Sequence, residues 1–411
     1  MPTTDGGRVL ADLRRLAEFG RYKTGVHRPT YSPDDIASRE WLVQQFAAAG
    51  LEAVIDGIGN VFGRSPCASR RLLVGSHSET QPHGGWLDGA LGVVYALELA
   101  RAFAADPACA GLGIEAVAWA DEEGHYGNML GSRSFTEGLS ATELDAAQSR
   151  EGKALRQALA DAGYAGRPYA RLDPARYVGY LEAHIEQGSM LEQAGQHIGI
   201  VEAIVGSWNY WITVSGEQNH AGTTEMHRRK DAGLALVQLA SAIHERFAAL
   251  AGQDRQSRTV WTIGRILLDP NAPSIVPGRA EMQVQFRDTD TAVLERFAAA
   301  LHQLVAAADR SGPCRIAIAP LSKSLPAAMD SRFQAAIEQA AERHVPGRHR
   351  RMPSGAGHDA QVLARRLRSG MMFVPSIGGV SHHWSEDTGE DDIVIGAQVF
   401  AAAAATILQA G

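Results

Sequence analysis

Two apolar runs, each followed at once by polar side chains, decide how this chain is expected to fold. The first run reads Leu72-Leu-Val-Gly-Ser-His-Ser-Glu79, and the second reads Ile114-Glu-Ala-Val-Ala-Trp-Ala-Asp-Glu-Glu-Gly124. A helical pattern from about Gly89 to Phe103 separates them, so strand, helix and strand alternate. This alternation predicts an α/β fold with a mostly parallel sheet. The polar residues then lie just past the carboxyl ends of strands, where open α/β sheets bind their ligands.

The length of the chain and a change of pattern in its middle predict two domains. A chain of 411 residues exceeds what one hydrophobic core usually organises. In the middle, two helical segments, Asp231–Leu250 and Ala292–Ala307, are surrounded by alternating apolar stretches at Tyr210–Val214, Val260–Ile266 and Ala280–Phe286. We therefore predict a mixed-sheet α/β domain from residues 1–208 and 323–411, interrupted by an inserted α+β domain of residues 209–322.

Two helices near the chain ends are predicted from their caps and composition. Ser32-Pro-Asp-Asp places a serine at the N-cap and a proline at the first helical position, and Gly50 ends the helix. The run Ile393–Leu408 comes nearest to a membrane span, but it contains Gln398 and a run of alanines. This composition is more typical of a helix packed at the end of a soluble chain.

Charge and composition exclude several classes of function. Lys and Arg number 39 against 46 Asp and Glu, a net charge of −7, and no large basic patch favours nucleic acid as a partner. Three scattered cysteines, Cys67, Cys109 and Cys314, do not form a disulfide framework or a thiolate zinc site. The N-terminus lacks a charged-then-apolar export signal, so we expect a cytoplasmic protein that does not enter a membrane. Because the chain has 15 His, any metal is expected to bind through nitrogen and oxygen.

Four apolar runs end in residues that bind metals. The first run is followed by His77 and, a little later, Asp88, and the second run is followed by Glu122 and Glu123. His184 lies at the third run, and His382 follows the fourth. Adjacent buried carboxylates repel each other unless a cation neutralises one, and the other can then act as a general base. Taken singly, each site also fits a satisfied polar side chain or a solvated acidic turn. The recurrence favours a site for two divalent ions, with two His on one side and His and Glu on the other.

These residues belong to motifs that resemble one family. The motifs GSHSETQPHGGWLDGALG, DEEGHYGNMLGSR, HIEQG, NHAGTT, PSGAGHDA and GGVSH run in order from about Asn60 to Glu386. Together they resemble the hydantoinase/carbamoylase branch of the metal-dependent aminoacylase and carboxypeptidase clan. The resemblance implies a two-domain dinuclear metallohydrolase whose inserted α+β domain serves as lid and dimerisation domain. It also implies a homodimer and two divalent ions per subunit, with Zn, Mn, Co and Ni all compatible with the ligands.

The resemblance also assigns roles to individual residues. His77 and His184 would bind one ion, Glu123 and His382 the other, and Asp88 both, while Glu122 would be the general base. His220 would stabilise the oxyanion in the active site of the partner subunit. Substrate contacts would come from Gln187, His358, Arg287, which would pair with a substrate carboxylate, and the position of Ser274. Taken alone, His220 also fits an ordinary turn and Arg287 an exposed strand residue.

Two departures from the family pattern bear on these roles. Where the family commonly has His-x-Asp, this chain has His77-Ser-Glu79, which is one methylene longer. Ser274 replaces an Asn that usually precedes Val276-Pro-Gly and contacts the substrate. We expect that metal affinity and the binding of the substrate's carboxyl end differ accordingly.

The resulting expectation is an amidohydrolase that cleaves a linear, non-peptide C–N bond. The expected substrate is a small anion with a carboxylate, either an N-carbamoyl amino acid or a related ureido acid. Two alternatives remain at this point: an aminoacylase or dipeptidase, and a non-catalytic protein that binds metal or a small acid. The presence of Glu122 beside all five expected ligands argues against the non-catalytic alternative.

Overall fold

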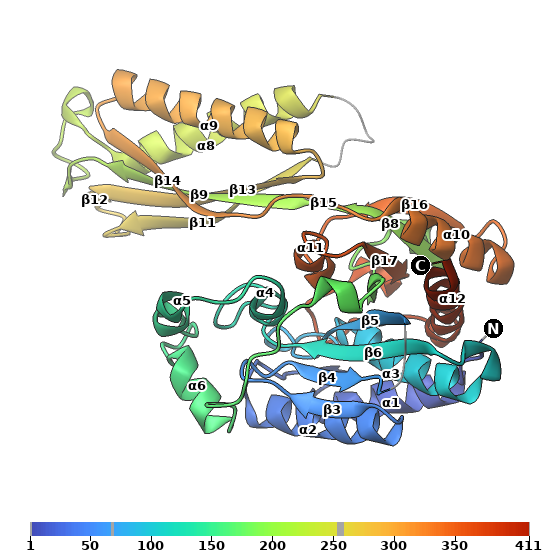
Figure 1. The fold of residues 1–411 in the computed structure, drawn as a ribbon. Coiled ribbons are helices and arrows are strands. Elements are labelled where there is room, and N and C mark those ends of the chain that lie inside the picture. The colour runs from blue at the N-terminus through green and yellow to red at the C-terminus, as the bar shows by residue number, and fades with distance from the viewer. Residues whose placement is uncertain (1, 67–69, 253–258, 411) are drawn as a thin grey trace. The chain divides into compact units, whose positions relative to one another are not determined.

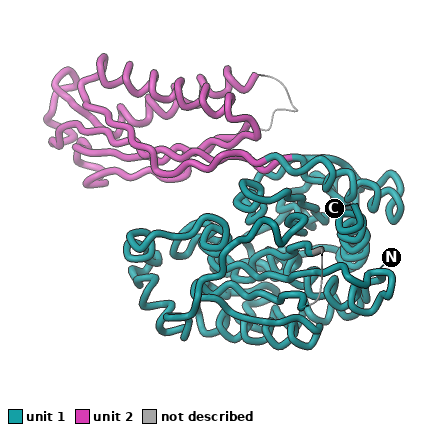
Figure 2. Tube along the Cα trace, in the orientation of Figure 1, with its two compact units in different colours: residues 1–202, 328–411 teal, residues 203–327 magenta. Residues whose placement is uncertain are grey.

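The computed structural model describes residues 2–66, 70–252 and 259–410. The chain divides into two compact units, of which the first comprises residues 1–202 and 328–411 and the second residues 203–327 (Figure 2). These limits differ by a few residues from the expected 1–208, 209–322 and 323–411. Cys109 and Cys314 are buried free thiols, and Cys67 lies outside the described residues.

The first unit is built on a nine-stranded mixed sheet in the order β15-β8-β17-β7-β5-β6-β4-β3, with β16 paired to β8 (Figure 1). The strands are β3 (Glu52–Ile55), β4 (Val61–Arg64), β5 (Arg70–His77), β6 (Leu112–Trp119), β7 (Gly179–Ile185), β8 (Ile198–Ile204), β15 (Ala327–Ala328), β16 (His349–Ser354) and β17 (Ser369–Val374). The central strands β17, β7, β5 and β6 pair in parallel, whereas β8 pairs antiparallel with β17, and β4 pairs antiparallel with β6 and with β3. The expected mostly parallel sheet is therefore limited to the centre. The loop of residues 56–60 is too short for a parallel crossover, so β3 and β4 pair as an antiparallel hairpin.

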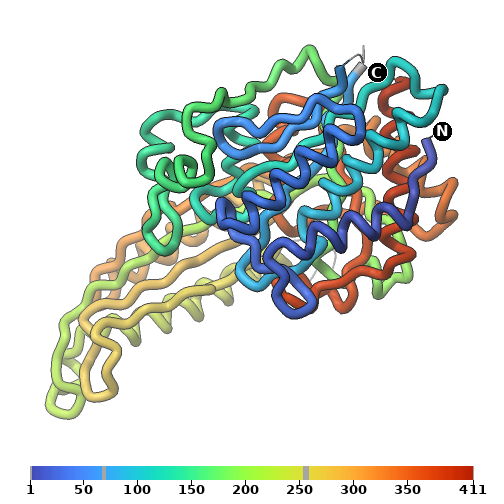
Figure 3. The backbone as a smooth tube through the Cα atoms, turned by 90° about the horizontal axis from the view of Figure 1, so that it is seen from below, coloured from blue at the N-terminus to red at the C-terminus, as the bar shows by residue number. Residues whose placement is uncertain are grey.

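The first unit also contains α-helices, several of which pack their apolar residues against the sheet. They are α1 (Gly6–Glu18), α2 (Pro33–Ala48), α3 (Ala90–Ala105), α4 (Leu130–Thr136), α5 (Ala141–Ala146), α6 (Leu155–Asp161), α7 (Met190–Gln193), α10 (Ser331–His344), α11 (Asp359–Leu363) and α12 (Glu390–Ala410). The predicted cap of α2 is confirmed, since the Ser32 side chain accepts a hydrogen bond from the Asp35 N–H. Helix α1 packs on α12, and the two chain ends lie on the same side of this unit in Figure 3.

Helix α12 contains the predicted terminal helix. By length and composition alone, α12 and α8 (Ala232–Ala251) are each long and apolar enough to cross a membrane. In α12, 67% of the most apolar stretch is buried within the structure. Its alanines from Ala401 to Ala405 join the hydrophobic core of the first unit. This burial is typical of the core helix of a folded domain.

The second unit is an α+β layer structure, as its alternating pattern predicts. Its antiparallel sheet has the order β11-β13-β9-β14, and two long helices lie on one face of it (Figure 1). The elements are β9 (Gly206–Ser215), α8, β11 (Val260–Asp269), β13 (Arg279–Asp288), α9 (Thr291–Ser311) and β14 (Arg315–Lys323). Every second residue of β9 and β13 is buried, from Tyr210 to Val214 and from Ala280 to Phe286. This period of two directs one face of the sheet toward the helices.

Candidate metal centre and active site

The parallel strands bring the expected metal ligands to one edge of the sheet. His77 is the last residue of β5, Glu122 and Glu123 follow the end of β6, and His184 lies near the end of β7. His382 comes from the loop after β17. Because β17, β7, β5 and β6 are neighbours with the same direction, their carboxyl ends meet at one edge. Asp88 lies just before α3, which follows β5 in the chain.

Two groups of ligand atoms share Asp88. His77, Asp88 and His184 form one group, Asp88, Glu123 and His382 form the other, and within each group the ligand atoms lie within 4.8 Å of one another. Asp88 Oδ1 is 3.1 Å from His184 Nε2 and 3.7 Å from His77 Nε2. Its Oδ2 is 3.3 Å from His382 Nε2. Asp88 therefore belongs to both candidate ligand groups.

The orientation of two imidazoles fits metal binding. His77 Nδ1 is 3.1 Å from the carbonyl oxygen of Glu79, and His184 Nδ1 is 2.9 Å from the carbonyl oxygen of Ile185. A carbonyl oxygen only accepts, so each Nδ1 carries a proton and donates it. In the neutral ring this leaves the lone pair on Nε2, the atom that faces Asp88. The donor set of imidazole nitrogens and carboxylate oxygens therefore fits first-row divalent ions.

The charges of the cluster favour a bound cation. Burial alone raises the pKa of Asp88, but hydrogen bonds from His184 and His382 hold it well below its usual range, so Asp88 is ionised. The hydrogen bond to Asp88 in turn raises the pKa of His382 to about 9. The negative charge that favours the protonated form of these imidazoles would also attract a divalent cation.

Glu122 has the environment of a tuned general base. Burial and the neighbouring carboxylate of Glu123 raise the pKa of Glu122 well above its usual value. Its Oε2 lies 3.8 Å from His77 Nε2, and 10% of its side chain is exposed. A carboxylate with a raised pKa beside the ligand cluster can accept a proton and return it.

Residues that the sequence reasoning did not assign hold the ligands in place. Gln81 donates from Nε2 to Glu123 Oε2 at 2.7 Å. Buried Glu386 accepts the Asp88 N–H at 3.0 Å with one oxygen and the Ser381 hydroxyl at 2.9 Å with the other. Gln81 and Glu386 each lie within a few residues of an expected ligand, which was the available signal, but the ligands that they contact, Glu123 and Asp88, come from distant parts of the chain.

Two expected substrate residues lie beside the expected metal ligands. Gln187 Nε2 donates to Asp88 Oδ2 at 3.2 Å and to the Ser381 hydroxyl at 3.1 Å. His358 is buried, its Nε2 is 2.8 Å from the Ser354 hydroxyl, and its ring centroid is 4.6 Å from that of His184. Burial lowers the pKa of His358 well below its usual value, so the ring is neutral.

The other three expected residues belong to the second unit. His220 lies in β10 (Asn219–His220), which pairs with β12 (Ile275–Val276) next to Ser274. His220 Nδ1 accepts the N–H groups of Gly222 and Thr223 at 3.0 and 3.1 Å. In the neutral ring the proton is therefore on Nε2, which makes this exposed atom a hydrogen-bond donor.

Arg287 lies far from His220 and Ser274 within the second unit. Arg279 begins β13 three residues after Val276, whereas Arg287 is near the other end of the strand. Eight steps along an antiparallel strand correspond to about 27 Å. Arg287 is half-buried, its Nε donates to Gln285 Oε1 at 3.0 Å, and burial lowers its pKa. The fold therefore does not bring all three residues to one place in the same chain.

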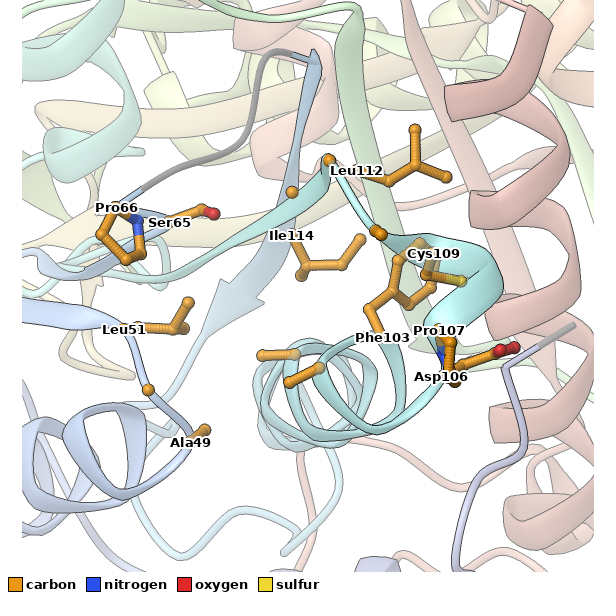
Figure 4. A pocket seen from close by; sticks show the side chains of 16 residues that line it. Ala49, Leu51, Ser65, Pro66, Phe103, Asp106, Pro107, Cys109, Leu112 and Ile114 are labelled. Atoms are coloured by element: carbon orange, nitrogen blue, oxygen red, sulfur yellow. The ribbon is translucent and has the colours of Figure 1, made fainter.

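A separate pocket of about 310 Å³ lies between the ends of α2 and α3 and the start of β6 (Figure 4). Among its lining residues, only Asp106 and Cys109 carry titratable side chains. The Asp106 side chain accepts a hydrogen bond from the Ala108 N–H and so caps the short turn that begins at Pro107. This pocket contains none of the expected site residues.

Comparison with known proteins agrees with this geometry. Residues 73–406 match the Peptidase family M20/M25/M40. The chain is 33% identical to allantoate amidohydrolase of Bacillus subtilis (strain 168), covering 93% of this chain and 92% of that protein. It is 32% identical to N-carbamoyl-L-amino-acid amidohydrolase of Paenarthrobacter aurescens, covering 95% of each. The crystal structure of an amidase of the hydantoinase/carbamoylase family from Burkholderia phymatum superposes with a TM-score of 0.89 at 44% identity, covering 100% of this chain and 99% of that one. The chain therefore belongs to the M20/M25/M40 peptidase family and, within it, to the hydantoinase/carbamoylase branch.

Proposed function

We propose that this chain, a hydrolase of linear, non-peptide C–N bonds, acts on an N-carbamoyl amino acid or a related ureido acid with the help of two divalent ions. The observation that carries the proposal is the pair of ligand groups that share Asp88, with Glu122 beside them. The names of its relatives, allantoate amidohydrolase and N-carbamoyl-L-amino-acid amidohydrolase, support this class of substrate.

The proposed mechanism assigns one task to each group of residues. His77, His184 and Asp88 would hold one ion, and Glu123, His382 and Asp88 the other. Bound there, Zn, Mn, Co or Ni ions would polarise the scissile carbonyl and acidify the attacking water. Glu122 takes a proton from the attacking water and later delivers it to the leaving nitrogen. A carbamoyl substrate yields the amine, ammonia and carbon dioxide.

We propose further that His220 acts as an oxyanion donor in the active site of the partner subunit. Its Nε2 is the proton-bearing atom in the neutral ring, because Nδ1 accepts two backbone N–H groups. Arg287 would pair with the carboxylate of the substrate, for which a guanidinium is well suited. Arg287 lies about 27 Å along β13 from Arg279, which begins the strand just after β12, and a small ureido acid cannot span this distance. If His220 and Arg287 contact the same substrate molecule, they therefore come from different chains of the dimer. Ser274 comes from the same chain as His220.

The surface of the second unit supports a homodimer. Most of the large apolar side chains that are exposed among the described residues belong to this unit, including Val237 on α8 and Ile266 on the edge strand β11. Clustered exposed apolar side chains typically mark an interface. We propose a cytoplasmic homodimer that acts on small anionic substrates.

Ammonia release tests the substrate class. Purified protein loaded separately with each candidate metal is incubated with N-carbamoyl α- and β-amino acids, allantoate and ureidoglycolate. We expect at least one of them to release ammonia. Turnover of N-acyl amino acids or dipeptides only would instead establish the aminoacylase or dipeptidase alternative.

The Glu122→Gln variant tests the general base. We expect its metal content to match the wild type, because Glu122 is not a proposed ligand, and kcat to fall by about 10²- to 10⁴-fold. Metal content is measured by elemental analysis and kcat by ammonia release. Retained hydrolysis would contradict the proposed mechanism.

A further inference from the structure

The carboxylate of Glu79 does not contact the imidazole of His77. The carbonyl oxygen of Glu79 takes the Nδ1 proton of His77, at 3.1 Å. The nearest carboxylate oxygen, Oε1, is 4.0 Å from the same nitrogen, beyond hydrogen-bonding distance. The orientation of this expected ligand is therefore held by the main chain at residue 79.

The carboxylate instead lies between Glu122 and Arg39. Oε1 of Glu79 accepts the backbone N–H of Glu122 at 2.6 Å. Oε2 accepts from Arg39 Nη2 at 2.9 Å. The side chains of Glu79 and Arg39 are both fully buried, so neither contact is exchanged for water.

Arg39 is itself fixed on several sides. Its Nε contacts both oxygens of Asp35 at 3.0 and 2.9 Å. Its Nη1 donates to the carbonyl oxygens of Gly59 and Trp119 at 2.9 and 3.2 Å. Trp119 ends β6, the strand that leads to Glu122. Arg39 therefore holds the Glu79 carboxylate at a constant position relative to the end of this strand.

The Glu79 carboxylate holds the backbone at Glu122 next to a residue with a positive φ. Asp121, the preceding residue, has a φ of 58°, in the left-handed region that is unfavourable for a non-glycine residue. The direction of the Glu122 side chain depends on this peptide. An Asp at position 79 is one methylene shorter and cannot keep both the Arg39 contact and the Glu122 N–H contact.

We propose that Glu79 is a positioning residue for Glu122 rather than for the ligand His77. This inference rests on the proposed role of Glu122 as general base. It explains why the longer acid at this position is compatible with an intact site: the main-chain carbonyl orients the histidine, and the side chain orients the base.

Three proteins test the proposal: the wild type, Glu79→Asp and the control Glu98→Asp. Glu79→Asp keeps the charge but loses the reach to Glu122. We expect its kcat to fall by about 10- to 100-fold, with KM and Zn²⁺ affinity within about threefold of the wild type. Glu98→Asp shortens another fully buried carboxylate, which accepts the Asp5 N–H and pairs with Arg8, and we expect it to lower the melting temperature with little change in kcat.

Zn²⁺ affinity is measured by competition with a chromophoric chelator, and kcat and KM by ammonia release at saturating metal. A Zn²⁺ affinity reduced by tenfold or more in Glu79→Asp, with a wild-type kcat at saturating metal, would assign Glu79 to His77 and overturn the proposal. An equal loss of kcat in both variants would show that Glu79 has only a structural role, and this result would also overturn the proposal. Failure of the wild type on every ureido acid would refute the proposed function, and the Zn²⁺ affinities, which need no substrate, would still decide whether Glu79 serves His77.

Discussion

At the scale of single residues, Asp88 is the centre of the candidate site because each of its oxygens faces a different histidine. Oδ1 faces His184, and Oδ2 faces His382 and the amide of Gln187. Gly89, which follows Asp88, has a φ of 67°, in the left-handed region. It lies against the His77 ring, and a Cβ at this position would be 2.5 Å from atoms of that ring. Only glycine permits this close approach.

The Glu386→Ala variant is expected to weaken metal binding. Glu386 joins the backbone N–H of Asp88 to the hydroxyl of Ser381, which precedes the expected ligand His382. Loss of such a supporting contact typically costs 10- to 100-fold in metal affinity, and we expect about that loss for Zn²⁺ in a chelator competition. Glu390→Ala, at an exposed ion pair with Arg14, serves as the control and should bind as the wild type does. Equal affinities in the two variants would contradict the supporting role.

At the scale of elements, the close pairing of β5 and β6 depends on Gly75. A Cβ at this position would lie 1.9 Å from the carbonyl oxygen of Val117 on the adjacent strand. Gly75→Ala is therefore expected to lower the free energy of unfolding by about 3 kcal/mol or more. Urea denaturation measures this effect. Gly264→Ala is the matched control, because its Cβ would meet no described atom nearer than 3.6 Å, and similar losses in both variants would contradict the argument.

The loop between β3 and β4 is expected to make stability depend on pH. Asp56 accepts the N–H groups of Ile58, Asn60 and Ala170, yet burial outweighs these bonds and raises its pKa from 3.8 to about 6. The folded state thus binds the proton more tightly than the unfolded state. The stabilisation is complete below the unfolded pKa and is lost as the pH rises through the folded pKa.

Comparison with Asp56→Asn isolates this contribution. From pH 4.5 to 6.5, the free energy of unfolding of the variant is expected to rise relative to that of the wild type by about 1–2 kcal/mol. Urea denaturation of both proteins across this range measures the difference. A difference that does not vary with pH would contradict the raised pKa.

At the scale of the whole molecule, the proposed homodimer predicts complementation between inactive variants. His220→Ala and Glu122→Gln are each expected to lose activity. In a mixed dimer, the site that contains the intact Glu122 receives the intact His220 from its partner. Equal mixing should restore about a quarter of the wild-type activity, because half of the dimers are mixed and each has one complete site.

Sizing chromatography and subunit exchange between tagged variants provide the control for this experiment. Exchange is allowed to reach equilibrium before ammonia release is measured. If mixed dimers form and no activity returns, His220 does not act in the partner's site. A monomeric wild type that is fully active would contradict the dimer itself.

Much of the fold was predictable because it depends on local patterns. The cap at Ser32, the alternation along β9 and β13 and the strand–helix–strand order around α3 are all short-range signals. The extent of the parallel arrangement was not predictable in this way, because pairing depends on the partner strand. Strand β14 was not among the expected strands. Ile316 and Ile318 are partly buried and alternate with exposed residues at its start, but all of its later residues are exposed, so the alternating pattern is short.

The sequence by itself indicated the chemistry of the site: which residue types can bind metal, that one of two adjacent carboxylates can act as base, and that these residues follow strands. Only the tertiary structure decided which of these side chains meet, because strand order and register join residues as distant in the chain as His77 and His382. The same holds for Glu79, whose contacts with Arg39 and Glu122 follow from buried packing rather than from any local pattern. Residue type sets what a group can do, whereas the long-range packing of the sheet sets its neighbours.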